Sequence, residues 1–216
     1  MAPRSPHLAV LSGDLIASSK APPSDTKTAI DRVSATAAAA ERWGENGPSH
    51  FTRVRGDGWQ FVVADHKFAL RAALRVFANL QCVPNLPHTR IAIGLGTADP
   101  LDGPDLSSAS GPAFEASGRA LDAMAKSDRF AISGVGATPL HHAIVALIDD
   151  HISRWTAEQA EATAYYLNPT DPTLKEIAGA LGISTQAVHS RIKGAGAQTL
   201  RETVRLWETH VESQPC

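Results

Sequence analysis

The first 150 residues alternate between short runs of β-forming apolar residues and longer segments with apolar or small residues at helical spacing. Strand-type runs occupy 7–16, 51–55, 59–63, 89–99 and 130–135. Helix-type segments occupy 24–43, 66–80 and 111–124. The order β-α-β-β-α-β-α-β, with a hairpin formed by the second and third strands, is typical of the split βαβ layout. We therefore expect an α+β fold with a ferredoxin-like antiparallel sheet and helices packed against it.

Beyond about residue 150 the strand pattern disappears and helical patterns follow one another. The turn-forming segment 167–173, rich in Pro, Thr, Asn and Asp, separates the first of these helices from the rest. Thr173 and Glu176 have the spacing of a capping box, and the apolar residues that follow recur at helical spacing up to Gly182. We expect one domain over 1–150 and a small all-α domain over 151–216.

A second short helix is predicted after Gly182, with Ser184 as its N-cap. Val188 and Ile192 recur at i and i+4, which leaves a polar face on the opposite side of this helix. Such a pattern is typical of a helix-turn-helix whose second helix enters the major groove of double-stranded DNA, with amide and imidazole groups at base edges and basic groups near phosphates. The residues expected to contact DNA are Ser184, Thr185, Gln186, His189, Ser190, Arg191 and Lys193. An ordinary helical hairpin is the alternative.

Charge limits how this segment could bind DNA. The net charge of −2 gives no overall attraction to nucleic acid, so binding depends on a local patch. Residues 184–205 hold four basic residues against Glu202 alone, a surplus of 4 − 1 = +3. One such module offers few phosphate contacts, so specific binding needs two copies and we expect a homodimer.

Localisation is inferred by exclusion. No run approaches the roughly 20 apolar residues of a membrane span, and the first residues lack the apolar core of a signal peptide. A cytoplasmic protein without a membrane partner is therefore expected.

Two acidic residues lie where the predicted topology would bring them together. Asp57 is in the Gly-Asp-Gly turn of the hairpin, and Asp14 ends the first strand. In a split βαβ sheet the first strand lies beside this hairpin, so Asp14 and Asp57 are expected to meet. Two converging carboxylates suit Mg²⁺ held together with the phosphates of a substrate. Taken alone, an Asp in a turn is more often structural.

Four motifs resemble the catalytic domain of class III nucleotidyl cyclases. They are SGDLIASS, RVRGDGWQF, RIAIGLGTA and GPAFEASGRAL, and they occur in the family's order within residues 6–135. Such a domain followed by a helix-turn-helix resembles the SatD-type group of bacterial proteins, and the terminal segment resembles region 4 of sigma factors. The resemblance implies a dimer with its ligand site between two cyclase-like domains.

The resemblance also assigns roles to individual residues. Asp14 and Asp57 take the two metal positions, with Mg²⁺ as the implied cofactor. The backbone around Ile16 would lie near the phosphates, and Arg119 takes the place of the arginine that stabilises the transition state.

Other positions depart from the family pattern. Arg53 stands where adenine-selective cyclases have a base-reading Lys, and Ser108 falls where its partner Asp is expected. Glu115 replaces the Asn that orients the ribose. Arg53 and Arg55 could contact phosphate or guanine, since the guanidinium group suits both, or could form ion pairs across a solvated hairpin.

The change at Glu115 bears most directly on activity. A carboxylate aimed at a triphosphate adds repulsion of roughly 1 to 4 kcal/mol at 4 Å, and losing a preorganised donor typically costs about 10² to 10³ in rate. We therefore expect a DNA-binding transcriptional regulator whose cyclase-like domain binds a nucleotide or cyclic nucleotide without efficient turnover. The alternative is an active class III cyclase that makes a 3′,5′-cyclic nucleotide from an NTP.

Overall fold

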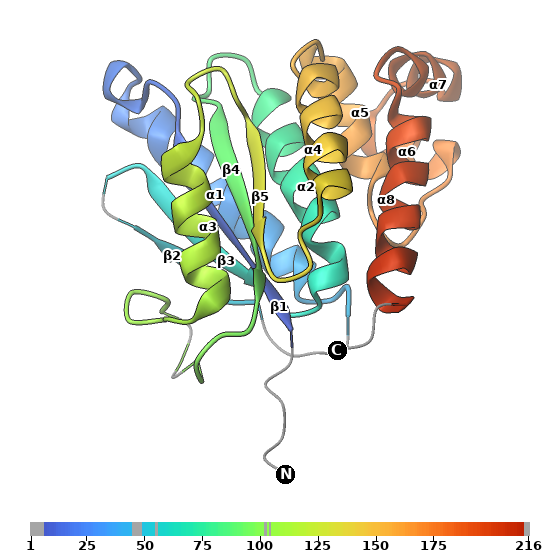
Figure 1. Cartoon of the computed structure of the whole chain (residues 1–216). Coiled ribbons are helices and arrows are strands. Elements are labelled where there is room, and N and C mark those ends of the chain that lie inside the picture. The colour runs from blue at the N-terminus through green and yellow to red at the C-terminus, as the bar shows by residue number, and fades with distance from the viewer. Residues whose placement is uncertain (1–6, 45–48, 55, 102, 104, 214–216) are drawn as a thin grey trace.

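The N-terminal part of the chain forms the elements that the hydrophobic pattern predicts, in the predicted order. The computed structural model describes residues 7–44, 49–54, 56–101, 103 and 105–213 (Figure 1). Two short 3-10 turns, η1 (Ser18–Lys20) and η2 (His66–Phe68), precede α1 and α2. The main elements are β1 (Leu8–Leu15), α1 (Pro23–Ala40), β2 (Phe51–Arg53), β3 (Gly58–Val63), α2 (Ala69–Gln81), β4 (Thr89–Gly96), α3 (Pro112–Ala123) and β5 (Phe130–Gly134).

The strands form one sheet in the order β2-β3-β1-β4-β5. The central strand β1 pairs antiparallel with β3 and β4, and β2 pairs with β3 in the hairpin. This arrangement confirms the α+β fold with a split βαβ core. The β4–β5 pair is parallel, so the sheet is mixed. The prediction of an antiparallel sheet does not hold for this pair. The difference arises because α3 carries the chain back across the sheet, so that β5 begins in the same direction as β4.

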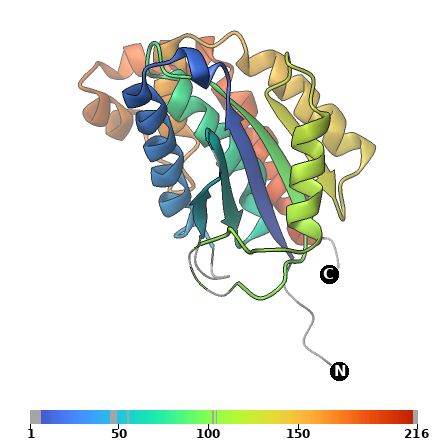
Figure 2. The ribbon, with the colours of Figure 1, turned by 90° about the vertical axis from the view of Figure 1, so that its left-hand side faces the viewer.

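Helices cover both faces of this sheet. α1 and α2 pack on one face and α3 on the other (Figures 1 and 2). Ala9, Leu11 and Leu15 belong to the core shared with α1 and α2, whereas Leu8 and Val10 pack in the cluster under α3. Because successive side chains of β1 are buried on opposite faces, the strand reads in the sequence as a continuous apolar run.

Gly94 of β4 marks a close approach between α3 and the sheet. A Cβ atom at this position would lie 2.1 Å from the carbonyl oxygen of Ala113 and 2.5 Å from the amide nitrogen of Ser117. Only glycine leaves room for this contact. Beside it, the hydroxyl groups of Ser12 and Ser117 form a buried hydrogen bond of 2.8 Å that ties β1 to α3.

The rest of the chain is helical and shares the core of the sheet. The helices are α4 (Pro139–Ile152), α5 (Ala157–Tyr166), α6 (Leu174–Leu181), α7 (Thr185–Gly194) and α8 (Ala197–Ser213). The expected domain boundary at 150/151 falls inside α4. A single cluster of buried apolar side chains runs from β1 to Trp207 of α8, and α5 packs directly on α2. None of the helices in the described ranges has both the length and the apolarity that crossing a bilayer requires.

A buried ion pair joins α2 to α8. The guanidinium group of Arg71 donates to the two carboxylate oxygens of Glu208 at 2.6 and 2.7 Å, and to the carbonyl oxygen of Leu167 at 2.9 Å. The Arg71 and Glu208 side chains are only 4% and 14% exposed. Because a bidentate pair of this kind is directional, it fixes α8 against the layer formed by α2.

Candidate functional site

Asp14 and Arg90 face each other at the ends of β1 and β4. They are register partners, on the face of the sheet where Ser12 contacts α3. Arg90 Nε donates to Asp14 Oδ1 at 2.9 Å, and Arg90 Nη2 donates to Asp14 Oδ2. The hydrogen bond to Asp14 is the main cause that raises the pKa of the Arg90 guanidinium, and the negative charges of Asp14, Asp122 and Asp128 add to it.

Asp57 lies beside this pair, at the tip of the β2–β3 hairpin. The residue after it, Gly58, is the register partner of Asp14, and the Leu15 amide donates to the Asp57 carbonyl oxygen at 3.3 Å. The Asp57 carboxylate accepts a hydrogen bond from the Ser18 hydroxyl in η1. The structure therefore brings both acids to the same end of adjoining strands, where each has a protein partner of its own.

These two acids have the oxygen chemistry that Mg²⁺ prefers, but they do not form a complete metal site. Within the described ranges, no three His, Cys, Asp or Glu side chains are grouped as metal ligands. A six-coordinate Mg²⁺ would need further oxygens from a phosphate group, and it would compete with Arg90 for Asp14 and with Ser18 for Asp57. The residues fit a cation delivered together with a nucleotide better than one held by the protein alone.

The other residues expected around a nucleotide are spread over several segments. Arg53 donates twice to the Gly56 carbonyl oxygen, at 2.7 and 3.0 Å, and so braces its own hairpin. The Ile16 amide donates to the His88 carbonyl oxygen at 2.7 Å, which takes it away from any phosphate. Ser108 is exposed on the loop before α3, and Arg55 lies outside the described residues.

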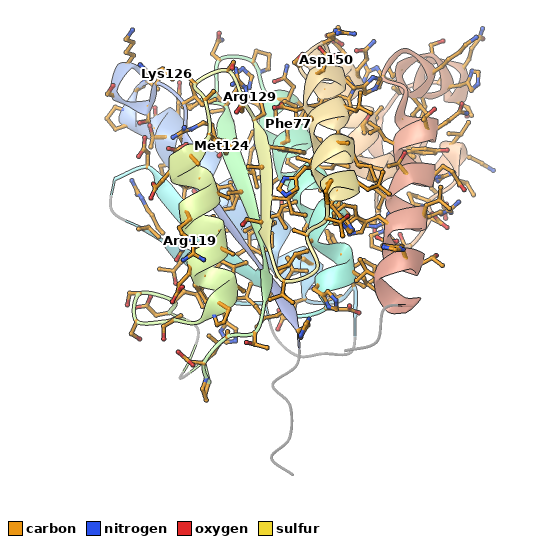
Figure 3. The ribbon with its side chains drawn as sticks, in the orientation of Figure 1. Phe77, Arg119, Met124, Lys126, Arg129 and Asp150 are labelled. Carbon is orange, nitrogen blue, oxygen red and sulfur yellow. The ribbon has the colours of Figure 1, made fainter. Side chains whose placement is uncertain are left out.

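Arg119 and Glu115 pair with each other on the outer side of α3. Arg119 Nη1 lies 3.2 Å from Glu115 Oε2, one helical turn away, and both side chains are exposed. Figure 3 shows Arg119 on the side of α3 that faces away from the sheet. Among the described side chains, no hydrogen bond or ion pair joins Arg119 to Asp14 or Asp57. Within one chain these groups do not form a single site.

The helices α6 and α7 follow the predicted caps closely. Thr173 and Glu176 form both bonds of a capping box at the start of α6. Gly182 ends α6 with a positive φ of 65°, which glycine adopts at no steric cost. The Ser184 hydroxyl then accepts from the Ala187 amide at 3.1 Å and starts α7.

One face of α7 is buried and the other is exposed. Val188 and Ile192 are fully buried and hold α7 against α5 and α6. Arg191 is partly buried, because its Nη1 donates to Glu161 of α5 at 2.8 Å, so it anchors α7 and does not project from it. The remaining residues expected to contact DNA are exposed: Ser184, Thr185, Gln186, His189, Ser190 and Lys193.

The positive charge counted around this helix is reduced by acids from other segments. Asp171 pairs with Arg205 and lies 3.7 Å from Arg201, and Glu161 pairs with Arg191. Including these two acids with Glu202 lowers the surplus from +3 to 4 − 3 = +1. Lys193 is the basic group of α7 that remains exposed.

Arg90 belongs to the candidate site although the sequence-based expectation did not include it. A signal was present, because Arg90 begins the motif RIAIGLGTA. Its position opposite Asp14 depends on the antiparallel register of β1 and β4, which the spacing of the two motifs does not determine.

The two candidate regions lie on opposite sides of the molecule. The hairpin tip and η1 are on the left in Figure 1, whereas α6, α7 and α8 are on the right. Figure 2, viewed from that left-hand side, shows the hairpin in front and the C-terminal helices behind the sheet. A ligand bound near Asp14 could not touch the exposed face of α7 in the same chain.

Comparisons with known proteins identify cyclase domains as distant structural neighbours. No protein-family model and no curated protein matches the chain. A bacterial light-regulated adenylyl cyclase has 15% sequence identity and a TM-score of 0.42, over 61% of this chain and 44% of that one. The dimeric guanylyl cyclase domain of the RhoGC fusion protein from the aquatic fungus Blastocladiella emersonii has 20% identity and a TM-score of 0.38, over 54% of this chain and 74% of that one. This chain thus spans less than half the length of the adenylyl cyclase, and at these scores the likeness decides nothing about the site.

Proposed function

We propose that this protein is a DNA-binding transcriptional regulator in which α6 and α7 form a helix-turn-helix and α7 is the recognition helix. The supporting observation is the division of α7 into two faces. Val188 and Ile192 attach it to the core, while the side chains of Gln186 and His189 are exposed and form no hydrogen bond or ion pair with another described residue. Amide and imidazole groups are able to hydrogen-bond to base edges in the major groove.

The position of these residues along α7 favours the same function. Thr185, Gln186 and His189 lie in the first half of the helix, which is the part that contacts base edges when a recognition helix enters the groove. Lys193 lies at the other end, where it can reach a phosphate. The low surplus of positive charge makes binding by one copy weak, so the regulator acts on DNA as a pair of copies.

The end of the sheet that carries Asp14, Asp57 and Arg90 is the proposed nucleotide site. A guanidinium group binds carboxylate and phosphate with the same geometry, so a bound phosphate can take Arg90 from Asp14. Release of Asp14 then provides one of two carboxylates for Mg²⁺. The pairing of Arg119 with Glu115, which stands where the resemblance expects an Asn, favours binding without efficient cyclisation. Because this site is remote from α7, a ligand would act on DNA binding by favouring one arrangement of the two copies.

Selection of DNA from a randomised duplex library tests the proposal. The protein is expected to enrich one sequence, and Gln186→Ala should weaken binding to that duplex about 5- to 150-fold, which corresponds to the 1–3 kcal/mol of a good base contact. Gln198→Ala removes the same amide from an exposed site on α8 and serves as the matched control. Equal affinities for the two variants, or no enriched sequence, would reject α7 as the recognition helix.

The nucleotide part is tested with the selected duplex. Titration of each NTP and each 3′,5′-cyclic nucleotide with Mg²⁺ should identify a ligand that changes the affinity of the protein for this duplex. The variant Asp57→Asn should remove this effect, and its affinity for the duplex without nucleotide should equal that of the wild type. DNA affinity that is indifferent to every nucleotide would remove the sensing function and leave DNA binding intact.

A further inference from the structure

Large exposed hydrophobic side chains gather on one side of the molecule. Four of the six found in the described part of the chain lie on the turn after β5, on α4 or on α8, with exposed fractions between 59% and 73%. These four are Val135, Leu140, Leu147 and Leu206. Scattered exposed apolar residues are normal, but several on adjoining elements indicate an interaction surface.

The apolar pattern of α4 explains this concentration. One face of the helix, with Val145, Ile148 and Ile152, is buried in the core. A second face carries Leu140, Ile144 and Leu147, and the first and last of these are 67% and 73% exposed. A helix at the surface of a monomer needs only one apolar face, so the second is available to a partner.

A groove between α4 and α8 continues this face. It is lined by Ile144, Leu147, Ile148, His151, Gly196, Thr199, Leu200 and Thr203. The helices run in opposite directions along it, since His151 of α4 lies against Gly196 at one end and His141 lies against Trp207 at the other. We use the term α4–α8 surface for Leu140, Ile144, Leu147, Leu200, Thr203 and Leu206.

We propose that the α4–α8 surface is the interface through which two copies of this chain pair. The charge of the surface identifies the partner. None of its six residues is ionisable, and His151, the ionisable residue that lines the groove, has its Nε2 bonded to the Ala195 carbonyl oxygen at 2.7 Å. An acidic or basic protein would therefore find no free counter-charge in the groove. A second copy presents the same apolar residues, and a two-fold axis sets apolar groups against apolar groups.

The orientation of the helices makes this pairing geometrically simple. A two-fold axis parallel to α4 and α8 places α4 of one copy against α8 of the other, which gives a four-helix arrangement. α7 and Asp150, near the end of α4, lie at the same upper end of the molecule (Figures 1 and 3). Such an axis therefore keeps both α7 helices at one end of the dimer, as binding of two half-sites requires.

This interface is distinct from the one that the cyclase resemblance implies, because the α4–α8 surface contains none of the residues around Asp14 or Arg119. Pairing through it does not depend on DNA binding. It supplies the two recognition helices that the proposed function needs.

Measurement of the mass in solution, without DNA, tests the inference. Light scattering after size exclusion should give twice the chain mass, 2 × 22.8 = 45.6 kDa, for the full chain. The double variant Leu147→Asp, Leu206→Asp puts four carboxylates into the dimer interface and should weaken pairing about a hundredfold or more, since each lost leucine removes most of its burial energy. The variant should then elute at 22.8 kDa.

Two controls keep the test decisive. Val54→Asp makes the same kind of change at an exposed apolar residue of the hairpin and should leave the dimer intact. Because Leu147 and Leu206 are mainly exposed in one chain, the double variant should retain the circular dichroism spectrum of the wild type. A monomeric wild type at all attainable concentrations, a dimeric double variant, or dissociation by Val54→Asp alone would each overturn the proposal. A dimer that binds no DNA would support this inference and refute only the proposed function.

Discussion

Replacing Glu208 by Gln tests how firmly the C-terminal helices are fixed to the sheet. The substitution keeps the shape of the side chain but removes the negative charge that neutralises Arg71, which is 4% exposed. Arg75 lies one helical turn further along α2, where burial and then the charge of Arg71 lower its pKa to about 10. The variant therefore leaves two adjacent guanidinium groups without the carboxylate that now pairs with one of them.

The expected cost follows from the burial of this pair. Breaking a buried ion pair by removing one partner destabilises proteins by about 3–5 kcal/mol. Since glutamine can still accept one hydrogen bond from Arg71, we expect a loss near 3 kcal/mol, at the lower end of this range. For a chain of this size such a loss corresponds to a decrease in Tm of about 6–12 °C.

Urea unfolding followed by circular dichroism and by tryptophan fluorescence measures this cost. One transition seen by both probes is expected, because the core is continuous from β1 to α8. The double variant Arg71→Met, Glu208→Leu removes both charges and should recover most of the loss, apart from about 1 kcal/mol for the Leu167 carbonyl oxygen that loses its donor.

Three results would refute this reasoning. A loss below about 1 kcal/mol for Glu208→Gln would place the pair among solvated ion pairs. A double variant as unstable as the single variant would show that an uncompensated charge is not the cause. Two separate transitions in the wild type would show that the helices beyond α4 unfold independently of the sheet.

Three further predictions concern pH, packing and turnover. Burial, and then the charges of His210 and His142, lower the pKa of the His141 imidazole below 6.5. Because His141 Nδ1 also accepts a hydrogen bond from the Thr138 amide, the folded state resists protonation of this ring. The free energy of unfolding should therefore fall as pH decreases below about 6.5, and it should depend less on pH in the variant His141→Gln. A denaturant midpoint that rises on acidification would contradict this prediction. Gly94→Ala should lower the free energy of unfolding by about 1–3 kcal/mol, because the added Cβ would overlap the backbone of α3. Gly118→Ala is the control: its Cβ meets nothing within 4 Å, so this variant should have a slightly higher free energy of unfolding. Equal melting curves for the two variants would show that α3 does not pack closely against β4. Incubation with each NTP and Mg²⁺ or Mn²⁺ should give no steady 3′,5′-cyclic product, and product formation that Asp57→Ala abolishes would establish the cyclase alternative.

Local signals account for the features that the sequence predicted well. The order of strands and helices follows from apolar periodicity, which acts within each segment. The starts of α6 and α7 follow from Thr173 and Ser184, whose side chains satisfy amide groups only three residues away. Short-range rules of this kind do not require knowledge of the tertiary fold.

The features that the sequence did not predict depend on contacts between distant segments. The parallel pairing of β5 depends on the path of α3 across the sheet. The pairing of Arg90 with Asp14 depends on strand register, and the pairing of Arg191 with Glu161 depends on how α7 packs against α5. For the same reason, the charge counted along residues 184–205 overestimates the charge that the folded protein presents.

The most direct test of the central claim, that the exposed face of α7 reads DNA, is the ratio of two dissociation constants. The Kd for the selected duplex is compared with the Kd for a duplex of the same composition in scrambled order, at one fixed salt concentration. We predict a ratio of about 10³ or more for the wild type, and a ratio reduced at least tenfold in the double variant Gln186→Ala, His189→Ala. A ratio near one for the wild type, or a large ratio that the double variant preserves, would contradict the assignment of α7 as the recognition helix.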